Sequence, residues 1–309
     1  MTVSYTHLQY VLGKDAVVRE AMTAVLAGGH VLLEDMPGVG KTTMAVAFAK
    51  SLGVSHRRVQ FTPDVMPSDL TGFSLYRREK EEFIYQEGSL FCNFLLADEL
   101  NRASPKTQSA LLEAMEEGNV SVEGVTRQLP APFFVIATQN PYGNAGTNDL
   151  PEAQVDRFMV SMSMGYPDFE SELLMAKTIG EREQLRNFRP AAERAQLTAM
   201  QKEVENVFIS EVIYRYLLQL VTKTRTDPYL KQGASPRATV ALVKAAKAGA
   251  WLKGRSFVIP ADVAEQYPYV ISHRIVPNAA AKMEGIGKDT IVRRILQSVD
   301  RPQMGEPRR

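Results

Sequence analysis

The sequence has few of the cysteine and histidine residues that form disulfide bonds or metal sites in small extracellular proteins. Of its 309 residues only Cys92 is a cysteine, which excludes an intrachain disulfide and a zinc site built from cysteines. The four histidines lack the close spacing of metal ligands. The N-terminus has no basic end followed by an apolar block, so no signal peptide is expected. A cytoplasmic protein is therefore expected, because disulfide-poor chains are typical of reducing compartments.

Charge of one sign and long apolar runs are also missing. Lys and Arg number 36 against 35 Asp and Glu, so the formal net charge is +1. This balance, without a basic stretch that alternates with aromatic residues, argues against nucleic acid as the partner. No apolar run approaches the roughly 20 residues of a membrane helix, so no membrane span is expected. A hydrophobic fraction of 45% nevertheless excludes wholesale disorder.

The first half of the chain alternates short apolar runs with helical patterns. Near-continuous apolar runs at 93–97 and 133–138 suit strands buried on both faces of a parallel sheet. Shorter strand-like runs lie at 30–34 and 58–61, and helical patterns lie at 41–52 and 104–117. This alternation predicts an α/β layered architecture with right-handed crossovers.

Two segments interrupt this alternation of strands and helices, and after them the chain becomes mainly helical in pattern. Residues 73–86 and 120–129 are predicted to be hairpins, and both are candidate functional inserts in a first domain, 1–167. Beyond it strand-like runs mostly disappear and helical patterns dominate, which predicts an all-α domain over 168–300. The remaining residues, 301–309, are expected to form a loose tail.

The strongest chemical signal is the segment 34–43, EDMPGVGKTT, which follows a predicted strand and opens a predicted helix. Its glycines let backbone N–H groups turn inward on phosphate oxygens, and the helix N-terminus adds partial positive charge. Lys41 can reach the β- and γ-phosphates, and the hydroxyl of Thr42 can bind Mg²⁺. Asp35 stands where the general pattern has its first glycine, and its charge would repel phosphates unless the carboxylate points away. The predicted nucleotide-binding residues here are Pro37, Gly38, Val39, Gly40, Lys41, Thr42 and Thr43.

An apolar strand that ends in two acids is the second signal. In FLLADE, 94–99, Asp98 lies at the carboxyl end of the strand and can hold Mg²⁺. Glu99 leaves the strand in another direction and can orient a water against the γ-phosphate as a general base. A small-molecule kinase must exclude such a water, so the consecutive acids favour a hydrolase.

Three polar residues farther along the chain are candidate phosphate sensors. Asn140 follows another strand and can hydrogen-bond an attacking water or the γ-phosphate, the alternative being an Asx-turn. Arg157 follows a short predicted helix and can stabilise charge on the γ-phosphoryl group across a subunit boundary. The alternative is a surface pair with Asp156 or a nearby acid. Arg237 follows the helix-starting pair Ser235-Pro236, so it lies where the helix dipole disfavours a cation. It is therefore expected to face an anion, and the γ-phosphate is the obvious one.

Together these segments resemble the AAA+ ATPases, and specifically the MoxR family. The matching segments are EDMPGVGKT, QFTPDVMPSDLTG at 60–72, ADELNRASPKTQSALLEAMEE at 97–117, ATQNP, LPEAQVDRF and GASPRA. The resemblance runs from residue 12 to about residue 299. It implies a P-loop NTPase αβα sandwich with a parallel five-stranded sheet, followed by an all-α helical lid. The two hairpins would be the helix-2 and pre-sensor-1 inserts of that clade, in which Asp35 is tolerated.

The resemblance also implies ATP hydrolysis to ADP and phosphate, with ATP and Mg²⁺ as cofactors. The catalytic residues would be Lys41 of Walker A, Glu99 of Walker B, Asn140 as sensor 1 and Arg157 as arginine finger. Arg237 would contact nucleotide as sensor 2, while Thr42 and Asp98 would hold the metal. The implied assembly is a ring, usually of six copies, with chaperone-like action on partner complexes and partners that carry von Willebrand factor A domains.

Three other functions are weighed against this one. A nucleic-acid-dependent motor of the same fold is disfavoured by the charge balance. A P-loop kinase acting on a small molecule is disfavoured by Glu99, Arg237 and the helical second domain. An ATP-binding scaffold without turnover is disfavoured because both strand-terminal acids are present.

Overall fold

The fold is described by a computed structural model, which covers residues 14–35, 39–79, 81–140, 150–177 and 190–303. The described residues form two compact units, between which the chain passes several times. The first unit contains the described residues within 1–21, 30–150 and 162–198, and the second contains those within 22–29, 151–161 and 199–309. The domain boundaries expected from composition remain a prediction.

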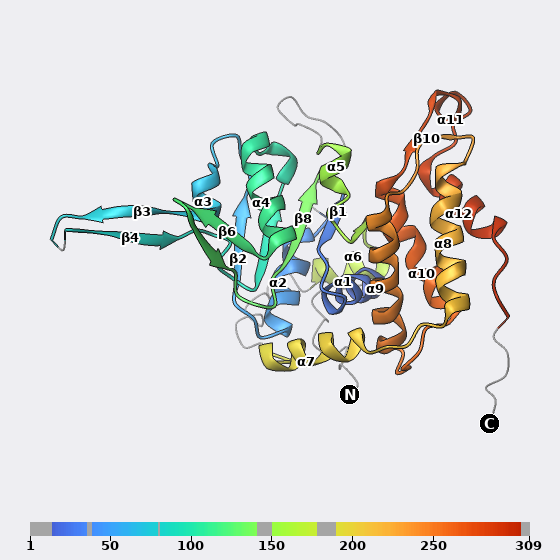
Figure 1. The fold of residues 1–309 in the computed structure, drawn as a ribbon, viewed down its shortest axis with the longest axis horizontal. Coiled ribbons are helices and arrows are strands. Elements are labelled where there is room, and N and C mark those ends of the chain that lie inside the picture. The colour runs from blue at the N-terminus through green and yellow to red at the C-terminus, as the bar shows by residue number, and fades with distance from the viewer. Residues whose placement is uncertain (1–13, 36–38, 80, 141–149, 178–189, 304–309) are drawn as a thin grey trace. The chain divides into compact units, whose positions relative to one another are not determined.

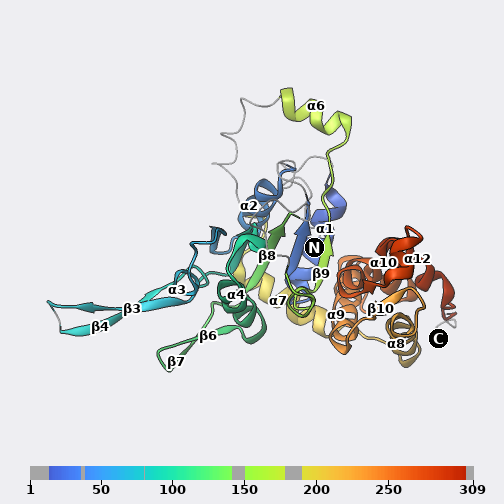
Figure 2. The ribbon, with the colours of Figure 1, turned by 90° about the horizontal axis from the view of Figure 1, so that it is seen from above.

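The main sheet has five strands in the order β2-β5-β8-β1-β9. Its strands are β1 (Val31–Glu34), β2 (His56–Gln60), β5 (Phe94–Asp98), β8 (Phe134–Gln139) and β9 (Val160–Met162). Figure 1 labels β2, β8 and β1, and Figure 2 labels β9. The pairings β2–β5, β5–β8 and β1–β8 are parallel. Every residue of β5 is buried, as expected for a strand covered on both faces. The predicted parallel α/β fold is confirmed.

Helices α2 (Lys41–Ser51), α3 (Pro67–Thr71) and α4 (Pro105–Glu117) lie in the connections between parallel strands of the sheet. Helix α1 (Asp15–Leu26) precedes β1, and α6 (Phe169–Lys177) follows β9. The start of α4 follows the sequence pattern, since Ser104 Oγ accepts a hydrogen bond from the Thr107 amide and Pro105 is the first helical residue. Gly118 ends α4 in a left-handed conformation.

Two antiparallel hairpins lie outside the main sheet. One pairs β3 (Gly72–Arg77) with β4 (Glu82–Glu87), and the other pairs β6 (Asn119–Val122) with β7 (Val125–Gln128). The β3–β4 hairpin extends away from the sheet in both views (Figures 1 and 2). The Arg127 guanidinium lies 3.7 Å from the centre of the Tyr85 ring, and Ser74 donates a hydrogen bond to Glu123. These contacts brace the first hairpin against the second.

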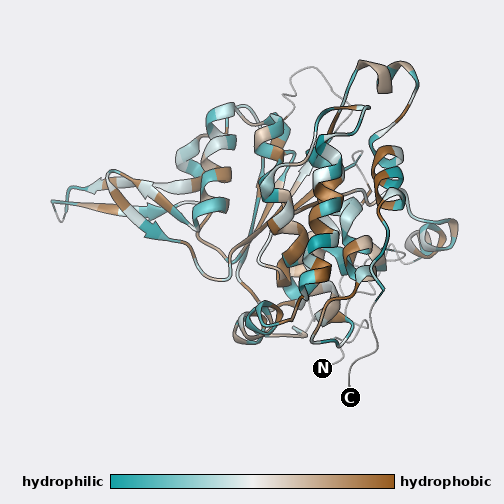
Figure 3. Cartoon of the chain, turned by 45° about the vertical axis from the view of Figure 1, so that its right-hand side comes forward, coloured by the Kyte–Doolittle hydropathy of each residue, from teal (hydrophilic) through white to brown (hydrophobic). Residues whose placement is uncertain are grey.

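The second unit is mainly helical. Its longer helices are α8 (Glu211–Arg225), α9 (Pro236–Leu252), α10 (Pro260–Ile271) and α12 (Lys288–Ser298), and α10 packs against the other three. Its shorter elements are α5 (Glu152–Val155), β10 (Leu230–Gln232), η4 (Ser272–Arg274), β11 (Val276–Pro277) and α11 (Ala279–Met283), while α7 (Arg194–Glu205) crosses from the first unit. The longer helices carry apolar residues on one side and polar residues on the other (Figure 3). The fully buried rings of Tyr216 and Tyr267 lie in its core.

No helix in the described ranges is long and apolar enough to cross a membrane.

Candidate functional site

The loop between β1 and α2 places its described residues at the start of a helix. Gly40 immediately precedes α2 with φ of 90°, a left-handed conformation that glycine adopts without a steric penalty. Lys41, Thr42 and Thr43 then form the first turn of α2, whose amide groups give this end partial positive charge. Val39 is partly exposed beside them. Pro37 and Gly38, also predicted to bind nucleotide, lie outside the described residues.

The side chain of Lys41 is buried and bends back toward the preceding strand. Its Nζ donates a 2.7 Å hydrogen bond to the main-chain oxygen of Asp35. Burial lowers the pKa of Lys41, and the nearby charges of Asp35, Asp98 and Glu99 raise it without cancelling the effect. An ammonium group with little hydration is a strong partner for phosphate oxygens.

The carboxylate of Asp35 is directed toward the segment after β9. Its Oδ1 accepts hydrogen bonds from Ser163 Oγ at 2.6 Å and the Gly165 amide at 3.1 Å. Its Oδ2 accepts one from the Met164 amide at 2.5 Å. The negative charge is therefore engaged by main-chain and hydroxyl donors and is directed away from the predicted phosphate-binding residues. This explains how the departure from the glycine pattern is accommodated.

Lys14 holds the same segment, and nothing in its sequence context predicted this role. Its ammonium donates to the carbonyl oxygens of Met164 at 2.5 Å, Gly165 at 3.1 Å and Tyr166 at 2.7 Å. Asp35 thus takes the N–H groups of residues 164 and 165, while Lys14 takes their carbonyl oxygens. Two buried side chains of opposite charge fix the main chain that leads from β9 to α6.

Replacing Asp35 by glycine restores the general loop pattern, yet we expect it to destabilise the fold. The change leaves the N–H groups of Met164 and Gly165 without their carboxylate, so the free energy of unfolding should fall by about 2–4 kcal/mol. Urea denaturation measures this difference, with the exposed Asp64→Gly as the matched control. An Asp35→Gly variant as stable as Asp64→Gly would contradict the role assigned to the carboxylate.

Asp98, the last residue of β5, collects three side-chain donors. Its Oδ2 accepts from Thr42 Oγ1 at 3.1 Å and from the Arg58 guanidinium at 2.8 Å, and its Oδ1 accepts from Thr138 Oγ1 at 2.7 Å. Burial would raise the pKa of Asp98, but the hydrogen bonds from Thr138, Arg58 and Thr42 together lower it. The group is therefore ionised at neutral pH. Its contact with Thr42 brings the two predicted metal ligands together.

Glu99 leaves the sheet because its backbone turns sharply at the end of β5. The residue has φ of 57° and ψ of 46°, a left-handed conformation that a side chain adopts at some cost. Its amide donates to Thr138 Oγ1 at 2.8 Å, which links it to the same threonine that holds Asp98. Its carboxylate pairs with Arg102 at 2.9 Å on the 3₁₀ turn η2 (Leu100–Arg102) and is about one-third exposed. Asp98 and Glu99 accordingly point to different surroundings.

Asn140 directly follows β8, the strand between β1 and β5. The main-chain carbonyl oxygen of Asn140 accepts a 3.1 Å hydrogen bond from the side-chain amide of Asn101, a buried residue of η2. The predicted residues of the first unit therefore gather at one edge of the sheet, because the carboxyl ends of neighbouring parallel strands meet there. These residues are Lys41, Thr42, Asp98, Glu99 and Asn140. Sequence spacing did not indicate their partners Arg58 and Thr138.

The two predicted arginines, Arg157 and Arg237, belong to the second unit. Arg157 follows α5, and Arg237 lies in the first turn of α9, where its Nη1 is 4.0 Å from Asp156 Oδ2. The anion that Arg237 faces in this structure is therefore a carboxylate of its own chain. Ser235 occupies the N-cap position as predicted, but its hydroxyl donates to Asp156 Oδ2 at 2.9 Å and does not cap the helix.

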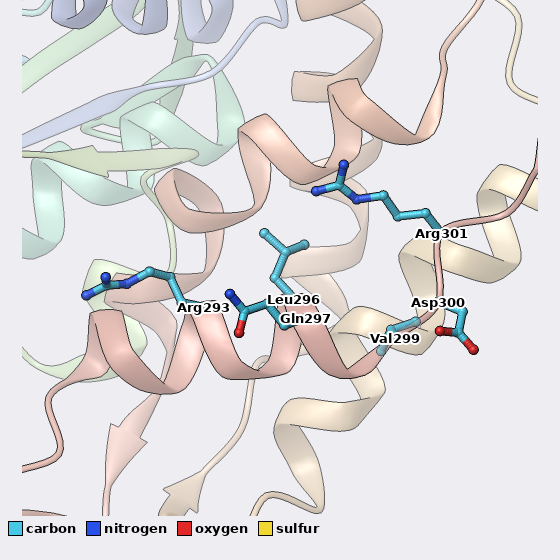
Figure 4. Close-up of a pocket in the computed structure, with 6 residues that line it drawn as sticks. All are labelled: Arg293, Leu296, Gln297, Val299, Asp300 and Arg301. Atoms are coloured by element: carbon cyan, nitrogen blue, oxygen red, sulfur yellow. The ribbon is translucent and has the colours of Figure 1, made fainter.

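A surface hollow at the end of α12 includes none of the predicted site residues. Figure 4 shows its lining of Arg293, Leu296, Gln297, Val299, Asp300 and Arg301.

The parallel sheet, the loop before α2 and the acids at the end of β5 define a P-loop NTPase of the AAA+ class. The model of the “ATPase family associated with various cellular activities (AAA)” matches residues 30–160, and the “AAA lid domain” matches residues 222–295. The chain is also similar in sequence to several curated proteins and in fold to a solved structure.

Two relatives and one structure match nearly the whole chain. The uncharacterized protein YeaC of Bacillus subtilis (strain 168) is 48% identical over 96% of this chain and 93% of its own length. Chaperone MoxR1 of Mycobacterium tuberculosis is 39% identical over 95% of this chain and 80% of its own. The crystal structure of a protein assigned as an ATPase from Cytophaga hutchinsonii ATCC 33406 superposes with a TM-score of 0.89 at 37% identity, covering 97% and 94% of the two chains. The chain belongs to the MoxR family of AAA+ ATPases.

Proposed function

We propose that this protein hydrolyses ATP to ADP and phosphate, and that a ring of its copies uses the energy to remodel partner proteins. One observation carries the first part. Thr42 of the phosphate-loop helix and Asp98 of β5 share a hydrogen bond, with Lys41 beside the first and Glu99 beside the second. This set combines phosphate donors, metal ligands and a candidate base at one edge of the sheet.

Each residue at this edge suits one task. The amides of Val39 to Thr43 and the Lys41 ammonium would bind the phosphates. The Thr42 hydroxyl and the ionised Asp98 are hard oxygen donors, which fits Mg²⁺, and the bound ion would neutralise charge on the phosphates. Glu99 would orient and deprotonate water, and the Asn140 amide would hydrogen-bond that water or the terminal phosphate.

The assembly and its partners form the second part of the proposal. A relative that matches four-fifths of its own length to this chain is named a chaperone, which supports action on proteins. We propose a hexameric ring in which Arg157 reaches the neighbouring nucleotide and Arg237 its own. A protein with a von Willebrand factor A domain is the proposed partner, and the cytoplasm the proposed location.

Phosphate release from ATP with Mg²⁺ tests the activity. We expect steady release by the full chain, reduced on the order of 100-fold or more by Lys41→Ala, because the lysine charge offsets phosphate repulsion. The exposed Lys106→Ala serves as the matched control. Native mass measurement should show multiples of 34.3 kDa when ATP and Mg²⁺ are present.

Three outcomes would point elsewhere. Stimulation by DNA or RNA with a steep salt dependence would favour a nucleic-acid motor. Transfer of phosphate to a metabolite would favour a kinase. Saturable ATP binding without phosphate release would favour a scaffold.

A further inference from the structure

A buried guanidinium holds the short segment that carries Arg157. Arg274 ends the turn η4 with its side chain only 2% exposed. It donates to Asp156 Oδ1 at 2.7 Å, and to the carbonyl oxygens of Asp156 at 3.0 Å, Phe158 at 2.6 Å and Met159 at 3.0 Å. A guanidinium has five N–H donors in one plane, so a single side chain can fix several acceptors rigidly.

These bonds enclose Arg157. The carbonyl groups of its two chain neighbours, Asp156 and Phe158, both accept from Arg274. The main chain at Arg157 therefore has little freedom. Burial of the Arg274 guanidinium makes the arrangement firm, because a buried charge that loses its partner is costly.

The second oxygen of Asp156 reaches a different element. Its Oδ2 accepts the 2.9 Å hydrogen bond from Ser235 and lies 4.0 Å from Arg237 Nη1. Ser235 would ordinarily use its hydroxyl to cap α9, but here that hydroxyl is engaged by Asp156. One carboxylate thus joins the backbone of Arg157 to the helix turn that carries Arg237.

The contacts that the two oxygens of Asp156 make with Arg274 and Arg237 differ in strength. The Arg274 side chain is 2% exposed and hydrogen-bonded to Asp156 at 2.7 Å, whereas Arg237 is 42% exposed and lies 4.0 Å from the same carboxylate. Exposed ion pairs are weak and easily exchanged. An anion that attracts Arg237 can therefore displace its contact with Asp156, which removes one of the groups that hold this carboxylate in place.

We propose that Asp156 is a positioning residue that sets Arg157 and Arg237 together, so that a phosphate bound by one arginine alters the placement of the other. This inference rests on the proposed function, because it requires both arginines to meet phosphate groups. The competing explanation is that Asp156 only ties secondary structure together, which would affect stability and nothing else.

Ser235→Ala separates the two explanations, since it removes one bond to Asp156 and no helix cap. Its matched control is Ser210→Ala at the N-cap of α8, where the serine also makes no side-chain cap bond. In Ser235→Ala we expect kcat to fall about five-fold with an almost unchanged KM for ATP, because the loss concerns positioning in the transition state. Hydrogen exchange of a peptide covering 151–160, measured without nucleotide, should accelerate about three-fold or more. The control should match the wild type in both measurements.

Mixed rings add a second test with Asp156→Asn, which keeps the side-chain shape and removes the charge. Lys41→Ala subunits can supply a well-placed Arg157 to an Asp156→Asn neighbour, but they cannot repair the placement of that neighbour's Arg237. We therefore expect mixing to restore clearly less hydrolysis to Asp156→Asn than to Arg157→Ala.

Two results would overturn the inference while the wild type still releases phosphate. One is a Ser235→Ala variant that exchanges hydrogen and turns over like Ser210→Ala. The other is equal recovery of hydrolysis by Asp156→Asn and Arg157→Ala in mixed rings. That result would show that Asp156 positions Arg157 and not Arg237. Absence of phosphate release by the wild type would instead remove the proposed function itself.

Discussion

Glu99→Gln should bind ATP as the unaltered chain does and lose hydrolysis by about 10²–10⁴-fold, the usual contribution of a general base. Glu99 is placed by its left-handed backbone conformation and by the hydrogen bond from its main-chain amide to Thr138 Oγ1. Neither feature depends on the charge of its carboxylate. Glutamine should therefore occupy the same position, and it can still hydrogen-bond a water. It cannot take a proton from that water, so binding and turnover should separate.

Equilibrium binding of labelled ATP and the rate of phosphate release measure the two effects. Glu113→Gln, an exposed residue of α4, is the matched control and should turn over normally. A Glu99→Gln variant with normal turnover would remove this residue from the role of base. Loss of ATP binding would show that its charge supports the site and does not act on water.

Arg157→Ala should lose hydrolysis by roughly 10³-fold or more and regain it when mixed with Lys41→Ala, which is inactive by itself. An arginine that stabilises charge on the transferred phosphoryl group contributes an effect of this size. Each variant retains what the other lacks, because Lys41 serves its own nucleotide and Arg157 is proposed to serve the neighbour's. Recovery therefore requires contact between two subunits.

Phosphate release across a series of mixing ratios measures this recovery, with native mass confirming mixed assemblies. Arg215→Ala, which breaks an exposed pair with Glu211 on α8, is the control and should be active without mixing. If mixed rings form and no ratio restores hydrolysis, Arg157 does not act across an interface.

Much of the fold could be predicted because its signals are local. The apolar runs of β5 and β8 required burial on both faces, and Ser104 with Pro105 marked the start of α4. Lys41 and Thr42 could be placed for the same reason, since a loop that opens a helix presents its amides in one direction. Asp98 and Glu99 followed from the alternation of side chains along a strand.

The partners of these residues could not be predicted. Asp35 meets Met164 across 129 positions, and Asp156 meets Arg274 across 118. Arg58 reaches Asp98 only because β2 pairs with β5 in the register that sets Gln60 opposite Asp98. Hydrophobic periodicity carries no information about which distant polar groups meet.

The difference between local signals and long-range contacts also explains the two findings that the motifs did not predict, which concern Asp35 and Arg237. Composition and motif spacing were sufficient for the class of protein, since a phosphate loop needs a strand, glycines, a lysine and a helix in immediate succession. The direction of the Asp35 carboxylate and the anion facing Arg237 depended on the folded chain. Each is decided by where a buried polar group finds hydrogen-bond donors, and those donors come from segments that only packing brings near.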